Sequence, residues 1–179
     1  MSHLPLWYMG QLGDEMCDRV VAELSPEEVK EATLGVDGAD VNLQTRKTAI
    51  RFAPQNYWLE GIFERFAMEA NKQCKWEYHI TEAERVQLAE YEPGHHYTWH
   101  TDTFTLSGNP LDRKITVVCL LNDVFEGGEF EVRLYSDYTT ALKKGSMIAF
   151  PSILEHRVKP VISGTRFSAT MWFKGPRFR

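Results

Sequence analysis

What the chain lacks already narrows the classes of protein it can belong to. No apolar stretch of its 179 residues approaches the roughly 18 residues needed to cross a bilayer. The N-terminal residues have neither a basic region nor a long apolar core, so we expect no signal peptide and a cytoplasmic location. A formal net charge of −5 gives no general attraction to nucleic acid, although a local basic patch can still exist within it.

Cysteine is also scarce. The three cysteines, Cys17, Cys74 and Cys119, are far apart and form no Cys-x-x-Cys pair. An odd number of separated thiols is typical of a reducing compartment rather than of a disulfide framework. No repeat, linker or low-complexity segment interrupts the chain, and its length suits one hydrophobic core. Residues 1–179 are therefore expected to form a single domain.

Helices are expected in the first part of the chain, about residues 1–76. Asp14 is positioned to cap a helix that runs to about Leu24, and Ser25, followed by a proline, repeats the start signal of a helix. Asn56–Cys74 has the strongest helical spacing, whereas Arg46–Phe52 alternates weakly and favours an edge strand. The apolar stripes that should pack on a sheet are Met16, Val20, Val21 and Leu24 in the first helix, and Trp58, Leu59, Ile62, Phe63, Phe66 and Ala70 in the longer one.

From Glu77 onward the pattern changes to short strands separated by Gly, Pro, Asn and Asp turns. About eight strands after a helical front predict an α+β fold, mainly β. Two antiparallel sheets would face each other as a double-stranded β-helix, or jelly roll, over about residues 77–176, with the N-terminal helices packed on one outer face. The candidate strands are Arg85–Glu92, Tyr97–Thr103, Lys114–Asn122, Gly128–Leu134, Tyr138–Ala141, Ser146–Phe150, His156–Ile162 and Arg166–Phe173.

Two histidines and an aspartate form a candidate metal site. Because side chains alternate along a strand, His100 and Asp102 point to the same side, and His156 begins a later strand that can lie beside them. Two imidazoles and one carboxylate are the facial triad of non-heme Fe(II) oxygenases, and they suit Fe(II) or a similar divalent ion. The His-x-Asp pair alone is a weak signal, since a surface strand with two polar residues has the same pattern. The later His156, with the basic Arg166 beyond it on a neighbouring strand, strengthens the metal-site interpretation.

Further segments stand in a characteristic order: Tyr91–Asp102 around the first two candidate ligands, then Arg113–Asn122, Glu126–Phe130, Gly145–Ser152, His156–Val161 and Gly164–Arg166. In this order they resemble the 2-oxoglutarate/Fe(II)-dependent dioxygenase superfamily, in the prolyl 4-hydroxylase-like branch and its small bacterial or bacteriophage members. The resemblance covers roughly residues 85–176, about half of the chain.

The resemblance implies a jelly-roll enzyme with Fe(II) on the triad and 2-oxoglutarate as cosubstrate, and with ascorbate as a candidate reductant. Arg166 would bind the distal carboxylate of 2-oxoglutarate, since a planar guanidinium matches two oxygens. Ser168 shares a face with Arg166 and is a candidate donor to the same carboxylate. Tyr91 is a candidate phenolic donor or, alternatively, a packed tyrosine. One departure is Leu120, at a place where many members have a tyrosine that bonds the cosubstrate.

The expected function is hydroxylation of a protein or peptide at proline, with conversion of 2-oxoglutarate and O2 to succinate and CO2. Two alternatives stay open: the same chemistry on a nucleobase or small molecule, and a cupin-like barrel that binds a metal or ligand without oxidation. Trp172 stands where nucleobase-demethylating members have a second arginine, which disfavours nucleic acid as a partner. No membrane partner is expected, a phage member would act in the host cytoplasm, and the sequence indicates no oligomeric state. Asp37–Lys47 and Thr103–Asp112 are candidate substrate lids.

Overall fold

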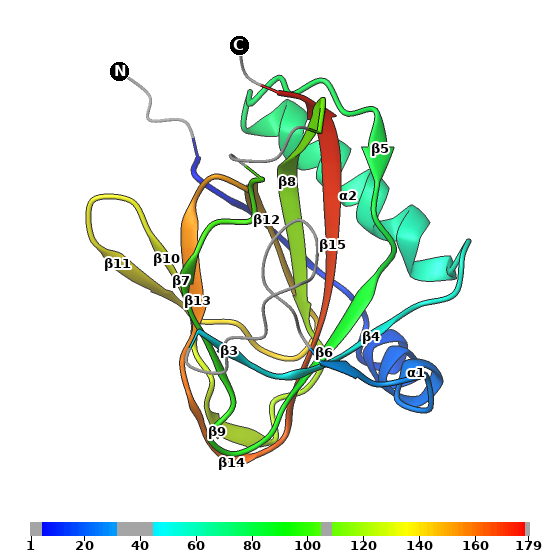
Figure 1. Ribbon diagram of the computed structural model, residues 1–179, viewed down its shortest axis with the longest axis vertical. Helices are drawn as coiled ribbons and strands as arrows, with labels where there is room; N and C mark the ends of the chain where they lie inside the picture. Colours follow the sequence, from blue (N-terminus) through cyan, green and yellow to red (C-terminus); the bar gives the residue numbers. More distant parts are fainter. Residues whose placement is uncertain (1–4, 32–44, 105–108, 178–179) are drawn as a thin grey trace.

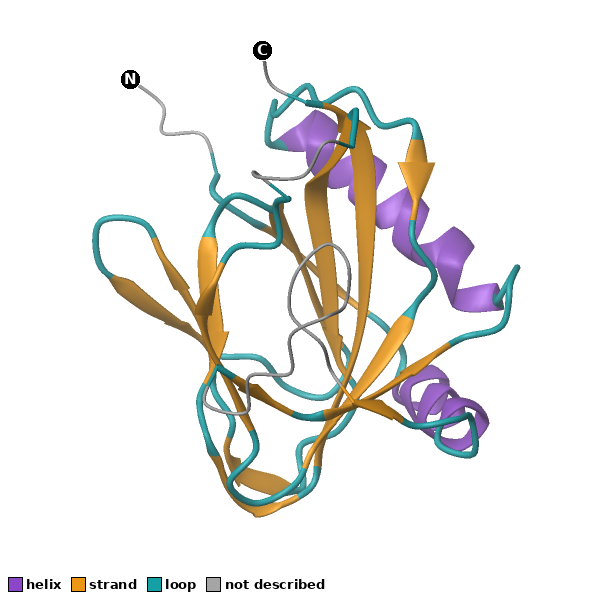
Figure 2. Ribbon diagram, viewed as in Figure 1, coloured by secondary structure: helices purple, strands orange, loops and turns teal. Residues whose placement is uncertain are grey.

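Two antiparallel sheets face each other, and two helices cover the outer face of the larger one (Figures 1 and 2). The computed structural model describes residues 5–31, 45–104 and 109–177. This arrangement is the predicted jelly roll, and the helices lie on one side only, as expected. Residues 37–44 of the first candidate lid and residues 105–108 of the second lie outside the described residues. None of the helices in the described part of the chain is long and apolar enough to cross a bilayer.

The larger sheet has the strand order β1-β12-β8-β15-β6-β4-β2, with β5 paired to β15. Its strands are β1 (Tyr8–Gln11), β2 (Lys30–Glu31), β4 (Ala49–Phe52), β5 (Glu82–Ala83), β6 (Gln87–Tyr91), β8 (Leu111–Leu120), β12 (Ser146–Pro151) and β15 (Arg166–Pro176). The long strands β8 and β15 lie side by side near its middle and carry side chains to both faces.

The smaller sheet has the order β11-β10-β13-β7-β3, and β9 pairs with β14 as a separate ribbon. Its strands are β3 (Arg46–Lys47), β7 (His96–His100), β10 (Phe130–Arg133), β11 (Asp137–Thr140) and β13 (Glu155–Val158), and the ribbon consists of β9 (Phe125–Gly127) and β14 (Val161–Gly164). Two predicted strands were wrong as single units. Arg46–Phe52 divides into β3 and β4 in different sheets, and His156–Ile162 divides into β13 and β14. Periodicity did not reveal either division, because the chain stays extended while it changes its pairing partner.

The helices α1 (Asp14–Leu24) and α2 (Trp58–Gln73) have almost the predicted bounds. The capping role of Asp14 was wrong, because Gly13 is the N-cap and Asp14 already lies in the first turn. Met16 was also wrong as a core residue, since it is 44% exposed and Cys17 is buried in its place. The helix start at Ser25 does not lead to a helix: this chain segment turns and continues into β2, which pairs with β4.

Strand alternation divides the apolar residues into two layers. On β8, Val117 and Cys119 join the core between the larger sheet and the helices, while Val118 belongs to the core between the sheets. Thr116 has the same parity as Val118 and therefore points between the sheets as well. The helices thus cover one face of the larger sheet, and its other face is available to form one wall of a site.

Candidate metal centre and cosubstrate cavity

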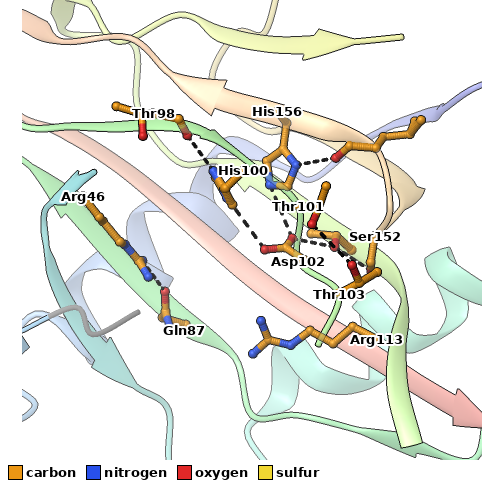
Figure 3. A network of polar contacts seen from close by, with 12 residues as sticks. Arg46, Gln87, Thr98, His100, Thr101, Asp102, Thr103, Arg113, Ser152 and His156 are labelled. Carbon is orange, nitrogen blue, oxygen red and sulfur yellow. Dashed lines mark hydrogen bonds and ion pairs between the residues drawn. The ribbon is translucent and has the colours of Figure 1, made fainter. Parts of the chain in front are cut away.

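His100 and His156 lie directly opposite each other on the neighbouring strands β7 and β13. Each imidazole is fixed through its Nδ1 atom, which lies 2.8 Å from the Thr98 carbonyl oxygen for His100 and 2.9 Å from the Leu154 carbonyl oxygen for His156 (Figure 3). When Nδ1 carries the proton and donates to these carbonyls, Nε2 keeps its lone pair for the site. Such backbone contacts are how metal-binding histidines are commonly oriented.

Asp102 lies just beyond the last residue of β7, not on the strand as predicted. Its position depends on tertiary contacts: the Asp102 amide donates to the Ser152 carbonyl at 2.9 Å, and the Thr116 hydroxyl donates to Asp102 Oδ2 at 2.8 Å. Thr116 belongs to the larger sheet and His100 to the smaller one. The carboxylate is therefore held between the two sheets.

The three side chains form one compact cluster. Their ligand atoms all lie within 4.8 Å of one another, with Asp102 Oδ2 at 3.4 Å from His156 Nε2 and Asp102 Oδ1 at 3.7 Å from His100 Nε2. Burial, assisted by the nearby His156, lowers the pKa of His100 to about 3. Burial alone would raise the pKa of Asp102, but the two histidines together lower it below its ordinary value. A neutral imidazole and an ionised carboxylate are the states that bind a divalent cation, so the donor set fits Fe(II).

Arg166 is buried in the same cavity, only 1% exposed. Its Nη1 donates to the Ser168 hydroxyl at 3.0 Å, its guanidinium carbon lies 5.4 Å from the centre of the Tyr91 ring, and its Nε has no hydrogen-bond partner. No carboxylate of the described residues forms an ion pair with it. Desolvation lowers the pKa of this guanidinium. A buried cation of this kind is costly unless an anion meets it, which fits the distal carboxylate of 2-oxoglutarate.

The structure corrects how Arg166 and His156 come together. The sequence predicted neighbouring strands, but β15 belongs to the larger sheet and β13 to the smaller one. The two side chains share a cavity because the sheets face each other, and only β14, which pairs with β9, lies between them in the chain. Asn122 fixes the start of β15, because its side chain bonds the Thr165 carbonyl at 2.7 Å and the Phe167 amide at 2.8 Å.

Several cavity residues escaped sequence analysis. Tyr97 stacks on His100 with ring centres 3.4 Å apart, and Arg46 lies over Tyr97 at 4.6 Å and donates to Gln87 at 3.0 Å. Thr116 was likewise missed as the hydrogen-bond donor to Asp102. Strand alternation could not reveal Tyr97, because it has the parity of Trp99, which points away; the register shift where His100 pairs with His156 and Tyr97 pairs with Val158 brings it to the cavity. Arg46 had no signal either, because only the pairing of β3 with β7 brings it to the cavity.

Other polar and aromatic residues near the site do not belong to the ligand cluster. His95 and His96 lie outside the ligand cluster, the former 4.0 Å from Glu92. Trp99 points away from the cavity and is covered by Arg133 at 3.8 Å and Arg157 at 4.6 Å. Arg51 does not line the cavity, because it is on the other face of β4 and pairs with Glu90 at 2.6 Å.

A jelly roll that holds two histidines and a carboxylate beside a buried unpaired arginine is typical of non-heme iron oxygenases. A family profile described as the 2OG-Fe(II) oxygenase superfamily matches residues 86–174. The chain belongs to this superfamily. The cofactors expected from the sequence, Fe(II) and 2-oxoglutarate, are those of the family.

Among curated proteins, a PKHD-type hydroxylase of Crocosphaera subtropica is 30% identical over 135 residues, which cover 73% of this chain and 59% of that protein. The chain thus spans less than two thirds of the length of this relative. Among solved structures, a Pseudomonas putida prolyl-4-hydroxylase superposes with a TM-score of 0.75 at 21% identity, covering 96% of this chain and 93% of the other. A Trichoplax adhaerens prolyl hydroxylase in complex with a hypoxia inducible factor peptide fragment gives 0.77 at 19%, covering 94% and 83%. At these identities the structures establish the fold alone.

Proposed function

We propose that the protein is an Fe(II)- and 2-oxoglutarate-dependent dioxygenase that hydroxylates a protein or peptide at a prolyl residue. The reaction consumes a substrate C–H bond, 2-oxoglutarate and O2 and yields the alcohol, succinate and CO2, with one oxygen atom of O2 entering the alcohol and the other entering succinate. Membership of the superfamily supports the oxygenase chemistry. The prolyl target is supported by the prolyl hydroxylases among similar proteins, one of which holds a peptide fragment.

One observation carries this proposal: a single cavity is lined by the three clustered ligand side chains and by the buried, unpaired Arg166. A metal-binding barrel without oxidation has use for the ligands but not for a second, cationic anchor at a distance from them. The alternative of a nucleobase substrate is less well supported. Trp172 stands where nucleobase-demethylating members have a second arginine. Among the described residues, the only cation stacked on Trp172 is Arg113, at 3.9 Å, and Glu84 already neutralises it at 2.6 Å.

Each residue has a defined task in this reaction. The Nε2 atoms of His100 and His156 and the carboxylate of Asp102 would hold Fe(II), which when bound supplies the activation of O2 and the oxidation of 2-oxoglutarate. Thr116 keeps the Asp102 carboxylate directed at the cluster through its hydroxyl. Arg166 would anchor the cosubstrate, and Ser168 fixes the orientation of its guanidinium.

The walls of the cavity perform a separate task. Val118, Phe130 and Val158 are buried apolar residues that line it between the two sheets. They keep bulk water from the reacting groups, which strengthens the electrostatic contacts inside and limits side reactions.

The experiment is the conversion of 2-oxoglutarate to succinate by the purified protein with Fe(II), ascorbate and O2, first alone and then with a library of proline-containing peptides. We expect slow succinate formation without peptide, faster formation with a subset of peptides, and a mass gain of one oxygen in those peptides. Succinate formation without any oxidised peptide, together with demethylation of an alkylated oligonucleotide, would move the protein to another substrate class. Absence of succinate under all conditions would refute the oxygenase proposal itself.

A further inference from the structure

The cavity is lined by a second buried arginine, Arg46, besides Arg166, the proposed anchor of the cosubstrate. Three arginines of the described residues are buried: Arg46 at 8% exposure, Arg51 at 9% and Arg166 at 1%. Arg51 has a carboxylate partner, Glu90, at 2.6 Å. Arg46 has none among the described residues, and its Nε atom lacks a hydrogen-bond partner. Arg46 therefore resembles Arg166, with an unneutralised cation that lines the same cavity.

The guanidinium of Arg46 is held in place by neutral groups. Its Nη2 donates to the Gln87 side-chain carbonyl at 3.0 Å, as Figure 3 shows, and its guanidinium carbon lies 4.6 Å from the centre of the Tyr97 ring. Tyr97 in turn stacks on the candidate ligand His100. These contacts fix the position of the cation beside the metal cluster, but none of them neutralises its charge.

Arg46 and Arg166 are at different positions along the cavity. On β6, Gln87 contacts Arg46, whereas Tyr91 lies opposite Arg166. The guanidinium of Arg166 reaches Ser168, the register partner of Ala89, so two residues of β6, or about 7 Å at the usual rise of a strand, separate it from the level of Gln87. 2-Oxoglutarate has two carboxylates. With one bound by Arg166 and the other directed at the ligand cluster, neither is left for Arg46. The anion that matches Arg46 must then come from another molecule.

We propose that the polypeptide substrate presents a carboxylate to Arg46, as an acidic residue next to the target or as the carboxylate of its C-terminal residue. This inference rests on the proposed function and narrows its substrate class to acidic substrates. A buried, unpaired guanidinium gains most from a charged, hydrogen-bonding partner, and its fork matches two carboxylate oxygens. Gln87 and Tyr97 then act as positioning residues for Arg46.

The test compares ligands that differ by a single charge. Protein loaded with Mn(II), a redox-inert substitute for Fe(II), and with 2-oxoglutarate is titrated calorimetrically with N-acetyl derivatives of the common amino acids, each as the acid and as the matched amide, starting with N-acetyl-L-proline and N-acetyl-L-prolinamide. We expect the best acid to bind at least about 30-fold more tightly than its amide, which corresponds to about 2 kcal/mol. Arg46→Gln should bring the ratio close to one, and Arg46→Lys should retain part of it.

Two controls establish whether the preference for acids depends on Arg46 itself. Arg157→Gln changes an arginine beside His156 that pairs with Glu131 outside the cavity, and it should leave the ratio unchanged. Affinity for 2-oxoglutarate should also be unchanged in Arg46→Gln. If no acid binds more tightly than its amide in the wild type, or if Arg46→Gln weakens 2-oxoglutarate instead, the inference is wrong.

Failure of the proposed oxygenase function gives a different experimental result from failure of the acidic-substrate inference. Succinate formation by the Fe(II) protein in the absence of any acid or amide reports on the oxygenase reaction alone. The binding ratio in the Mn(II) protein does not depend on turnover. An active oxygenase with a ratio near one refutes only the acidic substrate, whereas a protein without succinate formation refutes the proposed function.

Discussion

Arg166 offers the sharpest test of the cosubstrate site. The guanidinium is 1% exposed and has one neutral hydrogen bond, to Ser168 at 3.0 Å, in addition to the Tyr91 ring. Removing one partner of a buried, hydrogen-bonded charge pair costs about 2–5 kcal/mol. At about 1.4 kcal/mol per factor of ten, Arg166→Ala should weaken 2-oxoglutarate binding by tens- to thousands-fold. Arg166→Lys should be milder, because the charge survives but the planar fork does not.

The assay is an anaerobic titration of 2-oxoglutarate into the Fe(II) protein, followed through the metal-to-ligand charge-transfer band. Metal binding measured separately should be unchanged in both Arg166 variants, because the cluster of ligands is anchored by other contacts. Arg157→Gln, which alters the external pair with Glu131, is the matched control and should bind 2-oxoglutarate as the wild type does. Equal affinities for the wild type and a folded Arg166→Ala variant would refute the reasoning and move the cosubstrate elsewhere.

Three other expectations follow from the same structure. Replacing all three clustered ligand side chains with alanine should abolish one-to-one Fe(II) binding in an anaerobic metal titration while the circular dichroism spectrum stays folded; retained stoichiometric binding would contradict the assignment. Gly128→Ala should weaken the binding of 2-oxoglutarate by about tenfold or more. Gly128 has a φ of +64°, and an added Cβ would lie 2.8 Å from Arg166 Cδ. Calorimetry on the Mn(II) protein measures this affinity, and an unchanged affinity would contradict the expectation. Hydrogen bonds from Trp58, Arg19 and Tyr57 lower the pKa of Glu23 from 4.5 to about 2. Because the folded pKa is the lower one, this stabilisation is present above pH 4.5 and is lost as the pH falls toward 2. Urea unfolding should therefore show Glu23→Gln to be less stable than the wild type at pH 7, with the difference shrinking toward pH 2; a difference that is constant with pH would exclude this origin.

Hydrophobic periodicity in the sequence was sufficient to predict a helix or strand where one of its faces is buried over several turns or residues. The helix Asn56–Cys74 was predicted almost to its ends, and its residues Leu59, Phe63 and Ala70 are fully buried. The hydrophobic effect acts on every turn of such a helix, so its period is visible in the sequence. The same holds for β8 and β15, whose long alternating stretches lie in the middle of a sheet.

Very short strands, and segments that change their pairing partner along the chain, could not be predicted from periodicity. The two-residue strands β2, β3 and β5 carry too few side chains for a period, and they exist only because a partner strand completes their hydrogen bonds. The predicted helix start at Ser25 failed for the same reason. Local capping signals are worth about 1 kcal/mol, and pairing with another strand outweighs them.

The sequence by itself determined the residue types of the site: two histidines and an aspartate of suitable spacing, and an arginine on a later strand. It did not determine how they meet. Tertiary structure decided that His100 and His156 are register partners and that hydrogen bonds with Ser152 and Thr116 hold Asp102 in place. It further decided that Arg166 faces the cluster from the opposite sheet. It also brought Arg46 to the cavity from the edge strand β3. Residue chemistry and strand alternation are local and can be seen in one segment, whereas register, sheet facing and burial arise only when distant segments pair and exclude water.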